Sequence, residues 1–304
     1  MKISLGPVLF DWGRKGLTAF YELMAAQAPV DIIYLGEVVC SKRSGFEADE
    51  LISVAKKIKQ AGKQPVISTY GLVMSEQEQH FLREVIAQAK EEQIWVEAND
   101  MAAIGVGEGG ELVAGPHINT YNGETMDFLA DVGVNRVVFP VELPATAMKT
   151  IIDGQKGAGL ESELFAYGRL PLTFSARCYT ARAFNLHKAN CQFKCADFSD
   201  GMRVKTQDGK GFLNLNGVQT MSDPLYNLLG SIDLIKQTGI DIIRLSPQSQ
   251  NMVEVVHIWR DCLDGRMDAE EGITRMAELT GDQSGFCNGY FYDKPGLDFI
   301  ANPA

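Results

Sequence analysis

The chain has 304 residues, of which 45% are hydrophobic and 22% are charged, and its formal net charge is −11. These values are typical of a folded globular protein with enough apolar side chains for a core, and they exclude a largely disordered chain. A chain this acidic, with a pI near 4.9, repels a phosphate backbone and is a poor candidate for binding nucleic acid.

The N-terminal segment, MKISLGPVLFDWG, has a single Lys and a short apolar run that Asp11 interrupts. A secretory signal peptide needs a longer apolar region and a small-residue cleavage site, so this segment does not predict one. No stretch approaches the roughly 18 consecutive apolar residues of a transmembrane helix. We therefore expect a cytoplasmic protein, whose six cysteines bind metal or do redox chemistry rather than form disulfides.

Short apolar, β-rich runs alternate with amphipathic stretches through most of the chain. The expected strands are residues 3–10, 32–35, 65–69, 94–97, 112–114, 136–141, 164–167 and 240–245. The expected helices are residues 16–27, 46–61, 76–92, 123–131, 145–153, 223–238, 252–264 and 269–280. Alternation of this kind predicts a parallel sheet, and eight strands favour a closed (β/α)8 barrel of the TIM type over an open doubly wound sheet.

The spacing between the seventh and eighth expected strands is irregular. About 70 residues separate them, roughly twice what one barrel repeat needs. We therefore predict a single barrel domain over residues 1–304, with a cysteine-bearing insertion over residues 176–220 at the barrel mouth. Within the insertion, Asp208 and Gly209 lie between two β-rich runs and predict a hairpin turn.

Three of the six cysteines, Cys178, Cys191 and Cys195, lie in the insertion with the spacing C-x12-C-x3-C. A fourth, Cys40, follows the second expected strand, and in a barrel the residues after every strand converge on one face. Seven of the 28 Lys and Arg residues fall within residues 169–205, where their charge favours thiolates. The four cysteines together predict one metal centre, although a single cysteine is more often a buried apolar residue.

The spacing of the cysteines does not decide which metal they bind. Structural zinc sites usually contain two close C-x2–4-C pairs, whereas Cys191 and Cys195 form the single close pair of this set. A distant cysteine that completes the set is more typical of an iron–sulfur cluster, which the spacing favours over zinc without excluding zinc. Of the remaining cysteines, Cys262 reads as a packing residue, and Cys287 lies in a glycine-rich, aromatic segment without a partner at ligand spacing.

The runs FAYGRLPLTFSARCYTAR, GPHINTYN, RVVFPVELP and IIRLSPQS resemble the bacterial collagenase-like peptidase family, better described as cluster-dependent hydroxylation proteins. The likeness covers essentially the whole chain. The runs YLGEVVCSKR, RCYTARAFNLHKANCQFKC and NGYFYDKPGLDF are similar to the UbiU/UbiV proteins of oxygen-independent ubiquinone biosynthesis. This resemblance implies a [4Fe–4S] cluster on Cys40, Cys178, Cys191 and Cys195. It also implies a heterodimer with a UbiU-like protein, and hydroxylation of a quinone-precursor ring without O2 and with prephenate as the oxygen source.

Polar residues at the ends of barrel strands are the default candidates for binding substrate in this fold. A carboxylated aromatic precursor, or prephenate, favours a guanidinium that donates two parallel hydrogen bonds, so Arg169, Arg177 and Arg244 are the candidates, with Glu142 as a nearby carboxylate. The alternative for each arginine is a structural ion pair with a strand-end carboxylate such as Glu142.

Different classes of function remain open. The chain is either an iron–sulfur enzyme component that acts on a small aromatic or prenylated ring, or a non-catalytic partner that donates electrons or structure to another subunit. A weaker alternative is a zinc-stapled barrel that binds RNA or peptide. Peptidase activity has little support, because no Ser or Cys nucleophile with a His base can be assembled from the four histidines.

Overall fold

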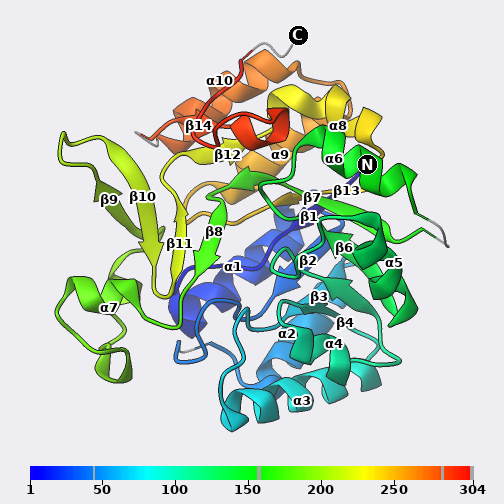
Figure 1. Cartoon of the computed structure of the whole chain (residues 1–304), viewed down its shortest axis with the longest axis vertical. Helices are drawn as coiled ribbons and strands as arrows, with labels where there is room; N and C mark the ends of the chain where they lie inside the picture. The colour runs from blue at the N-terminus through cyan, green and yellow to red at the C-terminus, as the bar shows by residue number, and fades with distance from the viewer. Residues whose placement is uncertain (44, 156–158, 282–283, 302–304) are drawn as a thin grey trace.

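The structure is a computed structural model that describes residues 1–43, 45–155, 159–281 and 284–301. Within these ranges, eight parallel strands form a closed barrel surrounded by helices (Figure 1). The barrel closes because β13 pairs with β1 on one side and β7 on the other, with Leu245 opposite Leu5 and Ile243 opposite Leu164. The predicted (β/α)8 fold class is therefore confirmed. The barrel strands are β1 Lys2–Leu5, β2 Ile32–Leu35, β3 Gln64–Ser68, β4 Trp95–Ala98, β5 Leu112–Ala114, β6 Val134–Val138, β7 Glu161–Gly168 and β13 Ile242–Leu245.

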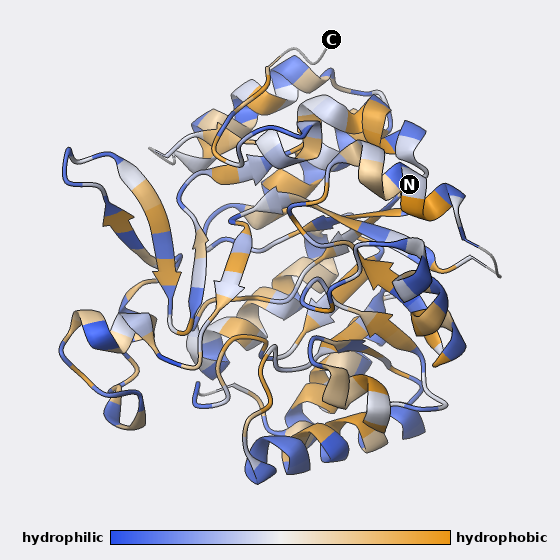
Figure 2. Cartoon of the chain, in the orientation of Figure 1, coloured by the Kyte–Doolittle hydropathy of each residue, from blue (hydrophilic) through white to orange (hydrophobic). Residues whose placement is uncertain are grey.

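Helices cover the outside of the barrel. They are α1 Gly13–Gln27, α2 Ala48–Gln60, α3 Glu76–Glu91, α4 Met101–Val106, α5 Gly123–Asp131, α6 Ala145–Asp153, α8 Ile232–Thr238, α9 Met252–Leu263 and α10 Ala269–Thr280. Figure 2 shows the expected contrast between hydrophilic outer helix faces, clearest on α3, and hydrophobic barrel strands. Across the described ranges, none of the helices combines the length and the apolar character that a membrane crossing needs.

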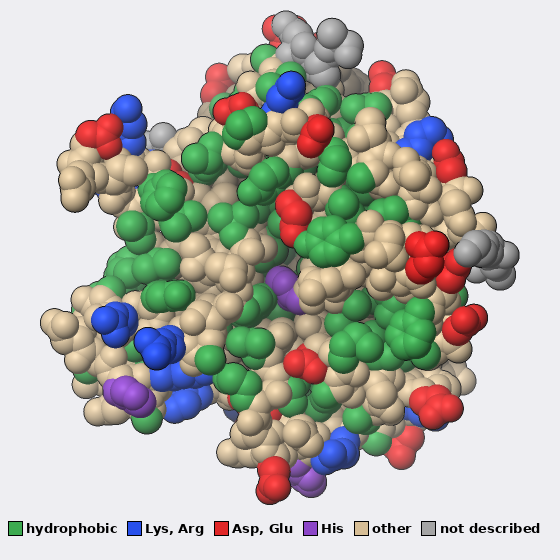
Figure 3. Space-filling view, in the orientation of Figure 1, with side chains coloured by type: hydrophobic (Ala, Val, Ile, Leu, Met, Phe, Trp, Pro, Cys, Tyr) green, Lys and Arg blue, Asp and Glu red, His purple; other side chains and the backbone are tan. Residues whose placement is uncertain are grey.

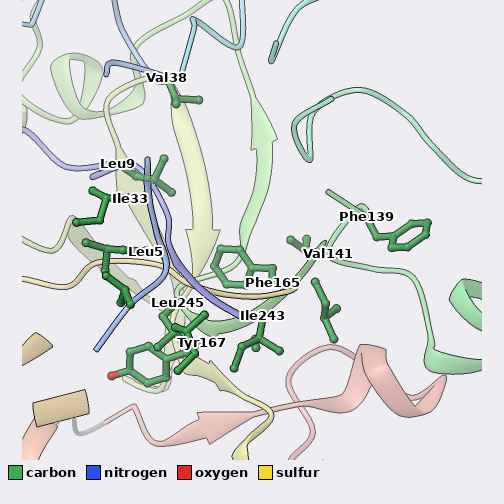
Figure 4. Packing of buried hydrophobic residues seen from close by; sticks show 14 of the residues in the cluster. Leu5, Leu9, Ile33, Val38, Phe139, Val141, Phe165, Tyr167, Ile243 and Leu245 are labelled. Atoms are coloured by element: carbon green, nitrogen blue, oxygen red, sulfur yellow. The ribbon is translucent and has the colours of Figure 1, made fainter. Parts of the chain in front are cut away.

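The hydrophobic core lies mainly between the barrel and its helices. Leu5, Ile33, Ile243 and Leu245 belong to neighbouring strands, are fully buried, and pack side by side in Figure 4. Because side chains alternate along a strand, the residues between these apolar ones point into the barrel. At several of these interior positions the sequence has a polar or charged residue instead of an apolar one.

A network of buried charges fills part of the barrel interior. The Arg244 guanidinium lies 2.6 Å from the Glu97 carboxylate and 2.7 Å from the Glu163 carboxylate. Arg136 donates to the hydroxyl of Tyr34, which in turn donates to Glu163 at 2.5 Å. Burial raises the pKa of Glu163, but the charges of Arg244 and Arg136 outweigh it, and its pKa is lowered overall. Pairing of this kind is what allows charged groups to be buried.

Between β7 and β13 the chain forms a second, antiparallel sheet that stands beside the barrel, at the left of Figure 1. The predicted hairpin turn is confirmed, since Asp208 and Gly209 join two antiparallel strands and Gly209 has a φ of +83°. The sheet already starts at Pro171, ahead of the range 176–220 expected for the insertion. Its strands are β8 Pro171–Phe174, β9 Met202–Lys205, β10 Gly211–Asn216 and β11 Gln219–Ser222, and α7 Tyr179–Ala183 follows β8.

The expected helix over residues 223–238 is confirmed only in its C-terminal part. Residues 223–238 form the strand β12 Leu225–Asn227 and a 3₁₀ turn before the helix α8 begins at Ile232. β12 pairs with β7 and with β14, a short strand over Phe286–Cys287. These pairings join segments far apart in the sequence, and such tertiary contacts override a local helical pattern.

Candidate metal centre

Cys40 lies in the loop that follows β2, at the carboxyl end of the barrel strands. The carboxylate of Glu37 shapes this loop, because its Oε1 accepts hydrogen bonds from the backbone N–H groups of Val39 at 2.7 Å and Cys40 at 3.0 Å. The N–H of Arg43 then donates to the carbonyl of Cys40 at 3.0 Å. Cys40 is therefore held by a network of loop hydrogen bonds that has a buried carboxylate at its centre.

The other three candidate cysteines lie in short turns of the insertion. Cys178 precedes α7, and its Sγ accepts a hydrogen bond from the N–H of Ala181 at 3.4 Å. Cys191 directly follows a 3₁₀ helix over Lys188–Asn190, and Cys195 lies in the 3₁₀ helix after that. Short turns, rather than one long helix, therefore position these three cysteines.

The backbone between Cys191 and Cys195 is strained. Gln192 and Phe193 both have a φ of 51°, in the left-handed region that residues other than glycine rarely adopt. Strain of this kind persists only where the surroundings hold it, and it is concentrated at functional sites. Phe193, which has this strained backbone, lines the same small cavity as the cysteines.

The two parts of the chain share one small cavity. Its volume is about 20 Å³, and its lining includes Cys40, Cys178, Cys191, Cys195, Lys42, Arg43, Lys188, Lys194 and Phe193. The four cysteines in this lining are partly exposed, whereas Cys262 and Cys287 are buried elsewhere in the molecule. A cysteine from the barrel and three from the insertion therefore face the same space.

The fit of a metal to this cavity rests on its donor atoms. Within the described ranges, no three His, Cys, Asp or Glu side chains are grouped so that they would hold a metal ion as they stand. The cavity has room for about one water molecule. Four thiolates are nevertheless the usual ligands of a [4Fe–4S] cluster, in which each thiolate binds a different iron atom. The ligand role of the four cysteines stays a prediction.

Positive side chains surround this cavity, and Figure 3 shows Lys and Arg gathered over α7 and the loop that follows it. Arg43 is the buried one. Its Nη1 donates to the carbonyl of Leu9 at 2.6 Å and its Nη2 to the Oδ1 of Asn216 at 2.5 Å, which ties the Cys40 loop to β10. Because a guanidinium stays protonated, Arg43 is a fixed positive charge near Cys40 and Cys195.

Burial has the largest effect on the pKa of two of the thiols, those of Cys195 and Cys40. It raises the pKa of Cys195 to about 11, against the opposing effect of the Arg43 charge. It also raises the pKa of Cys40, partly offset by a hydrogen bond from the backbone N–H of Lys42. Both thiols are therefore protonated at neutral pH in the absence of metal. A bound metal must displace these protons to obtain its thiolate ligands.

A much larger cavity, of about 790 Å³, adjoins the cysteine cavity. The loop after β2, helices α1, α2 and α3, and residues 188–193 of the insertion enclose it. Lys42, Arg43, Lys188, Cys191 and Phe193 line both cavities. A volume of this size falls within the range of about 300–1,000 Å³ that is typical of small-molecule sites.

The structure separates the residues that the sequence predicts to bind substrate. Arg244 lies inside the barrel, where its ion pairs with two buried carboxylates match the structural alternative considered for it, although Glu142 is not the partner. Arg169 is buried and donates to a backbone carbonyl, whereas Arg177 is exposed. Glu142 is exposed and accepts a hydrogen bond from the hydroxyl of Tyr121. Their role toward substrate stays a prediction.

Sequence reasoning did not single out Arg43 or Phe193, which line both cavities. The position of Arg43 three residues after Cys40 was a usable signal, because a cation next to a ligand cysteine stabilises the thiolate. Phe193 lies inside the C-x3-C spacing, where its identity carries no signal of its own. Its importance depends on the left-handed backbone, which only the folded loop reveals.

Comparison with known proteins places this chain in a family. The profile of peptidase family U32 matches residues 19–299. The collagenase of Porphyromonas gingivalis is 26% identical over 305 aligned positions, which cover 90% of this chain and 71% of that protein.

Among solved structures, a variant of the tryptophan synthase α-subunit from Pyrococcus furiosus is similar with a TM-score of 0.45 and 14% identity, covering 92% of this chain and 98% of that one. Thiamine phosphate pyrophosphorylase from the same organism is similar with a TM-score of 0.42 and 9% identity, covering 89% and 96%. The family profile spans nearly the entire chain, and the protein therefore belongs to peptidase family U32.

Proposed function

We propose that this chain is the UbiV-type subunit of an oxygen-independent hydroxylase that acts on ubiquinone-precursor rings. In this proposal it holds a [4Fe–4S] cluster on Cys40, Cys178, Cys191 and Cys195, works with a UbiU-like partner, and uses prephenate as the oxygen source. The observation that carries the proposal is the shared cavity of cysteines from the barrel and the insertion. Membership of family U32 is consistent with it at the level of the family.

A bound cluster would supply one-electron chemistry at this position. Four protein thiolates leave no iron atom open to substrate, so the contribution of the chain is to position the cluster beside the larger cavity and to set its charge. Arg43 serves both purposes, because it ties the Cys40 loop to β10 and adds a fixed positive charge beside two of the ligands. Positive charge near a cluster favours its reduced form.

The second candidate is a non-catalytic subunit, in which the cluster stabilises or donates electrons to a partner. The cavity of about 790 Å³ beside the cysteines favours the catalytic reading, since an accessory subunit has no need of a small-molecule cavity there. Within the described part of the chain, no histidine is hydrogen-bonded to a serine or cysteine side chain, as a nucleophilic peptidase mechanism would use.

Metal analysis tests the ligand set. The chain, purified without oxygen, is expected to contain about four iron and four sulfide per molecule. Replacing Cys40, Cys178, Cys191 and Cys195 together by Ser should abolish iron, whereas Cys262→Ser serves as the matched control and should retain it. Stoichiometric zinc in a colourless protein would reject the cluster, and iron loss in the control would reject the ligand assignment.

An activity assay tests the reaction. The chain is incubated without O2, alone and with a UbiU-like partner, with a quinone-precursor ring and prephenate, and the products are identified by mass spectrometry. Hydroxylation that needs both chains and all four cysteines supports the proposal. Cleavage of gelatin by the purified chain, unchanged in the variant without the four cysteines, would instead support the activity named for the P. gingivalis relative.

A further inference from the structure

We infer that Cys191 is the exchangeable ligand of the metal centre, whereas Cys40, Cys178 and Cys195 stay bound. The inference rests on the proposed function and deepens it, because release of Cys191 opens one position of the centre toward the cavity of about 790 Å³. Among the four cysteines, Cys191 alone lines this large cavity as well as the small one. The other three line the small cavity and not the large one.

Buried charged groups hold Cys40 and Cys195 from outside their own turns. The carboxylate of Glu37 accepts the N–H of Cys40 at 3.0 Å and lies 3.5 Å from the buried guanidinium of Arg43. The Sγ of Cys195 lies 3.6 Å from Oδ2 of the buried Asp11, and the charge of Arg43 favours its thiolate. Polar contacts that are shielded from water are strong, so these two cysteines are fixed before a metal binds.

The turn between β10 and β11 holds Cys178. The carbonyl of Gly217 in this turn accepts a hydrogen bond from the N–H of Tyr179 at 2.9 Å, and the N–H of Gly217 donates to the hydroxyl of Thr180 at 3.0 Å. Thr180 is fully buried. Gly217 has a φ of +66°, and a Cβ at this position would lie 3.1 Å from Nη2 of Arg43. The two residues after Cys178 are therefore fixed to the same turn that Arg43 packs against.

Cys191 has weaker support than the other three cysteines. Hydrogen bonds reach the Sγ atoms of Cys178 and Cys195, but none from the described part of the chain reaches the Sγ of Cys191. Its carbonyl accepts the N–H of Lys194, from its own loop, at 3.3 Å. The two residues that follow it have the strained, left-handed backbone described above, and such strain is typical of segments that switch between arrangements.

The loop that leads to Cys191 lies at the outer edge of the molecule, below α7 at the lower left of Figure 1. Two lysine side chains hold it. Nζ of Lys42 donates to the carbonyl of Lys188 at 3.2 Å, and Nζ of Lys188 donates to the carbonyl of Ala176 at 3.2 Å. Both hydrogen bonds are exposed to water, which competes for the same groups. The loop can therefore open locally while the barrel stays folded.

Exchange at Cys191 needs no oxidant or reductant. The bond between the metal and Sγ breaks with both electrons on the thiolate, which then takes a proton from water. A donor atom of a molecule in the large cavity supplies the replacing electron pair. Because Cys191 lies on the boundary between the two cavities, such a molecule reaches the centre without displacing the other three cysteines.

Protection from iodoacetamide tests this assignment. The iron-loaded chain and the same chain after removal of iron are alkylated without O2, and mass spectrometry gives the rate at each cysteine. A thiolate that stays bound to metal does not react, so loading should slow alkylation of Cys40, Cys178 and Cys195 by about tenfold or more, but that of Cys191 by about twofold or less. The ratio of the two rates removes differences in exposure among the thiols.

Single cysteine variants give a second measurement. Cys191→Ala should keep about three iron per chain and, after oxidation, show the electron paramagnetic resonance signal of a three-iron cluster. Cys178→Ala is the matched comparison and should lose most of its iron, because it removes a ligand that the turn between β10 and β11 holds in place.

A third measurement tests whether the support of Cys178 makes it a permanent ligand. Thr180→Val removes the hydroxyl that accepts from Gly217, so alkylation of Cys178 in the iron-loaded chain should become about fivefold faster. Thr180→Ser keeps the hydroxyl and should restore protection. Thr173→Val, at an exposed position of β8, is the control and should behave like the parent chain.

The outcomes separate the two proposals. Equal protection of all four cysteines in an iron-loaded chain would overturn the exchangeable ligand alone, and so would a loss of iron in Cys191→Ala as complete as that in Cys178→Ala. Zinc in the purified chain would reject the cluster. Because protection reports on whichever metal is bound, weak protection of Cys191 in a zinc-loaded chain would still support exchange at this ligand.

Discussion

Arg43 connects three parts of the molecule through one buried guanidinium, since it contacts the carbonyl of Leu9, Asn216 of the insertion and the carboxylate of Glu37. Removing a buried, hydrogen-bonded charge leaves its partners unpaired. We expect Arg43→Met to lower the free energy of unfolding by about 3–5 kcal/mol. Urea denaturation measures this loss.

The control for Arg43 is Arg14→Met, which removes an exposed ion pair with Glu50 and should cost at most about 1 kcal/mol. Equal losses in the two variants would show that Arg43 does not hold the Cys40 loop to the insertion.

His117 makes stability depend on pH. Burial, with a further effect of the Arg244 charge, lowers its pKa from the ordinary 6.5 to about 4. Between these values the unfolded chain binds a proton that the folded chain does not, so stability falls as the pH falls from about 6.5 to about 4. We expect the loss between pH 7 and pH 5 to be smaller by about 1–2 kcal/mol in His117→Gln.

Urea denaturation of the parent chain and His117→Gln at both pH values measures this difference. Asn119→Gln, a change nearby that does not titrate, is the control and should keep the pH dependence of the parent. The same dependence in His117→Gln would mean that other groups cause it.

Among the elements, α3 has a first turn that also lines the large cavity. Ser75 and Glu78 form a capping box, and Glu78 accepts a further hydrogen bond from the hydroxyl of Ser41 at 2.6 Å. We expect Ser75→Ala to cost about 1 kcal/mol of unfolding free energy. Glu78→Ala should cost more, because it also frees the link to the Cys40 loop. Thermal denaturation compares them with Thr18→Ala, a change at a half-buried position in the middle of α1 that should cost less than about 0.5 kcal/mol. A larger loss in Thr18→Ala than in Glu78→Ala would contradict this account.

The elements also show which parts of the fold the sequence can predict. Barrel strands are covered on both faces, so they form short apolar runs, and each of the eight predicted runs overlaps a strand of the barrel. The predicted helix over residues 223–238 is confirmed only as α8 over Ile232–Thr238, because Leu225–Asn227 pairs with β7 and β14, and such distant partners leave no local periodicity.

The candidate site likewise has one part that the sequence predicts and one part that it does not. Cys178, Cys191 and Cys195 lie close together in the sequence, and barrel topology gives Cys40 a reason to approach them. The large cavity has no comparable signal. Its walls come from α1, the loop after β2, α3 and residues 188–193, so its existence depends on how these segments pack.

At the scale of the whole molecule, hydrogen bonds outside residues 184–195 also attach the insertion to the barrel, among them those of Asn216 with Arg43 and with the carbonyl of Leu9. Trp12 Nε1 donates to the carbonyl of Ser199 at 2.6 Å, and the N–H of Ser249 donates to Asp200 at 2.7 Å. If a cluster also joins the two parts, its loss should free residues 184–195 while the barrel stays folded.

Limited proteolysis tests this coupling. We expect the iron-depleted chain to be cleaved first within residues 184–195, and the iron-loaded chain to resist cleavage there at the same protease concentration. Cleavage at equal rates in both forms would show that metal does not hold the insertion.

Because β13 closes the barrel, the barrel stays open while the ribosome makes the chain between β7 and β13. β13 pairs with β1 and β7, and the whole insertion separates it from β7. A ribosome that adds 5–20 residues per second needs roughly 4–15 s between the end of β7 and the end of β13. During that interval the nascent chain has two unpaired sheet edges, which are prone to pair with other chains. For those seconds, the emerging chain is open to aggregation through these two edges.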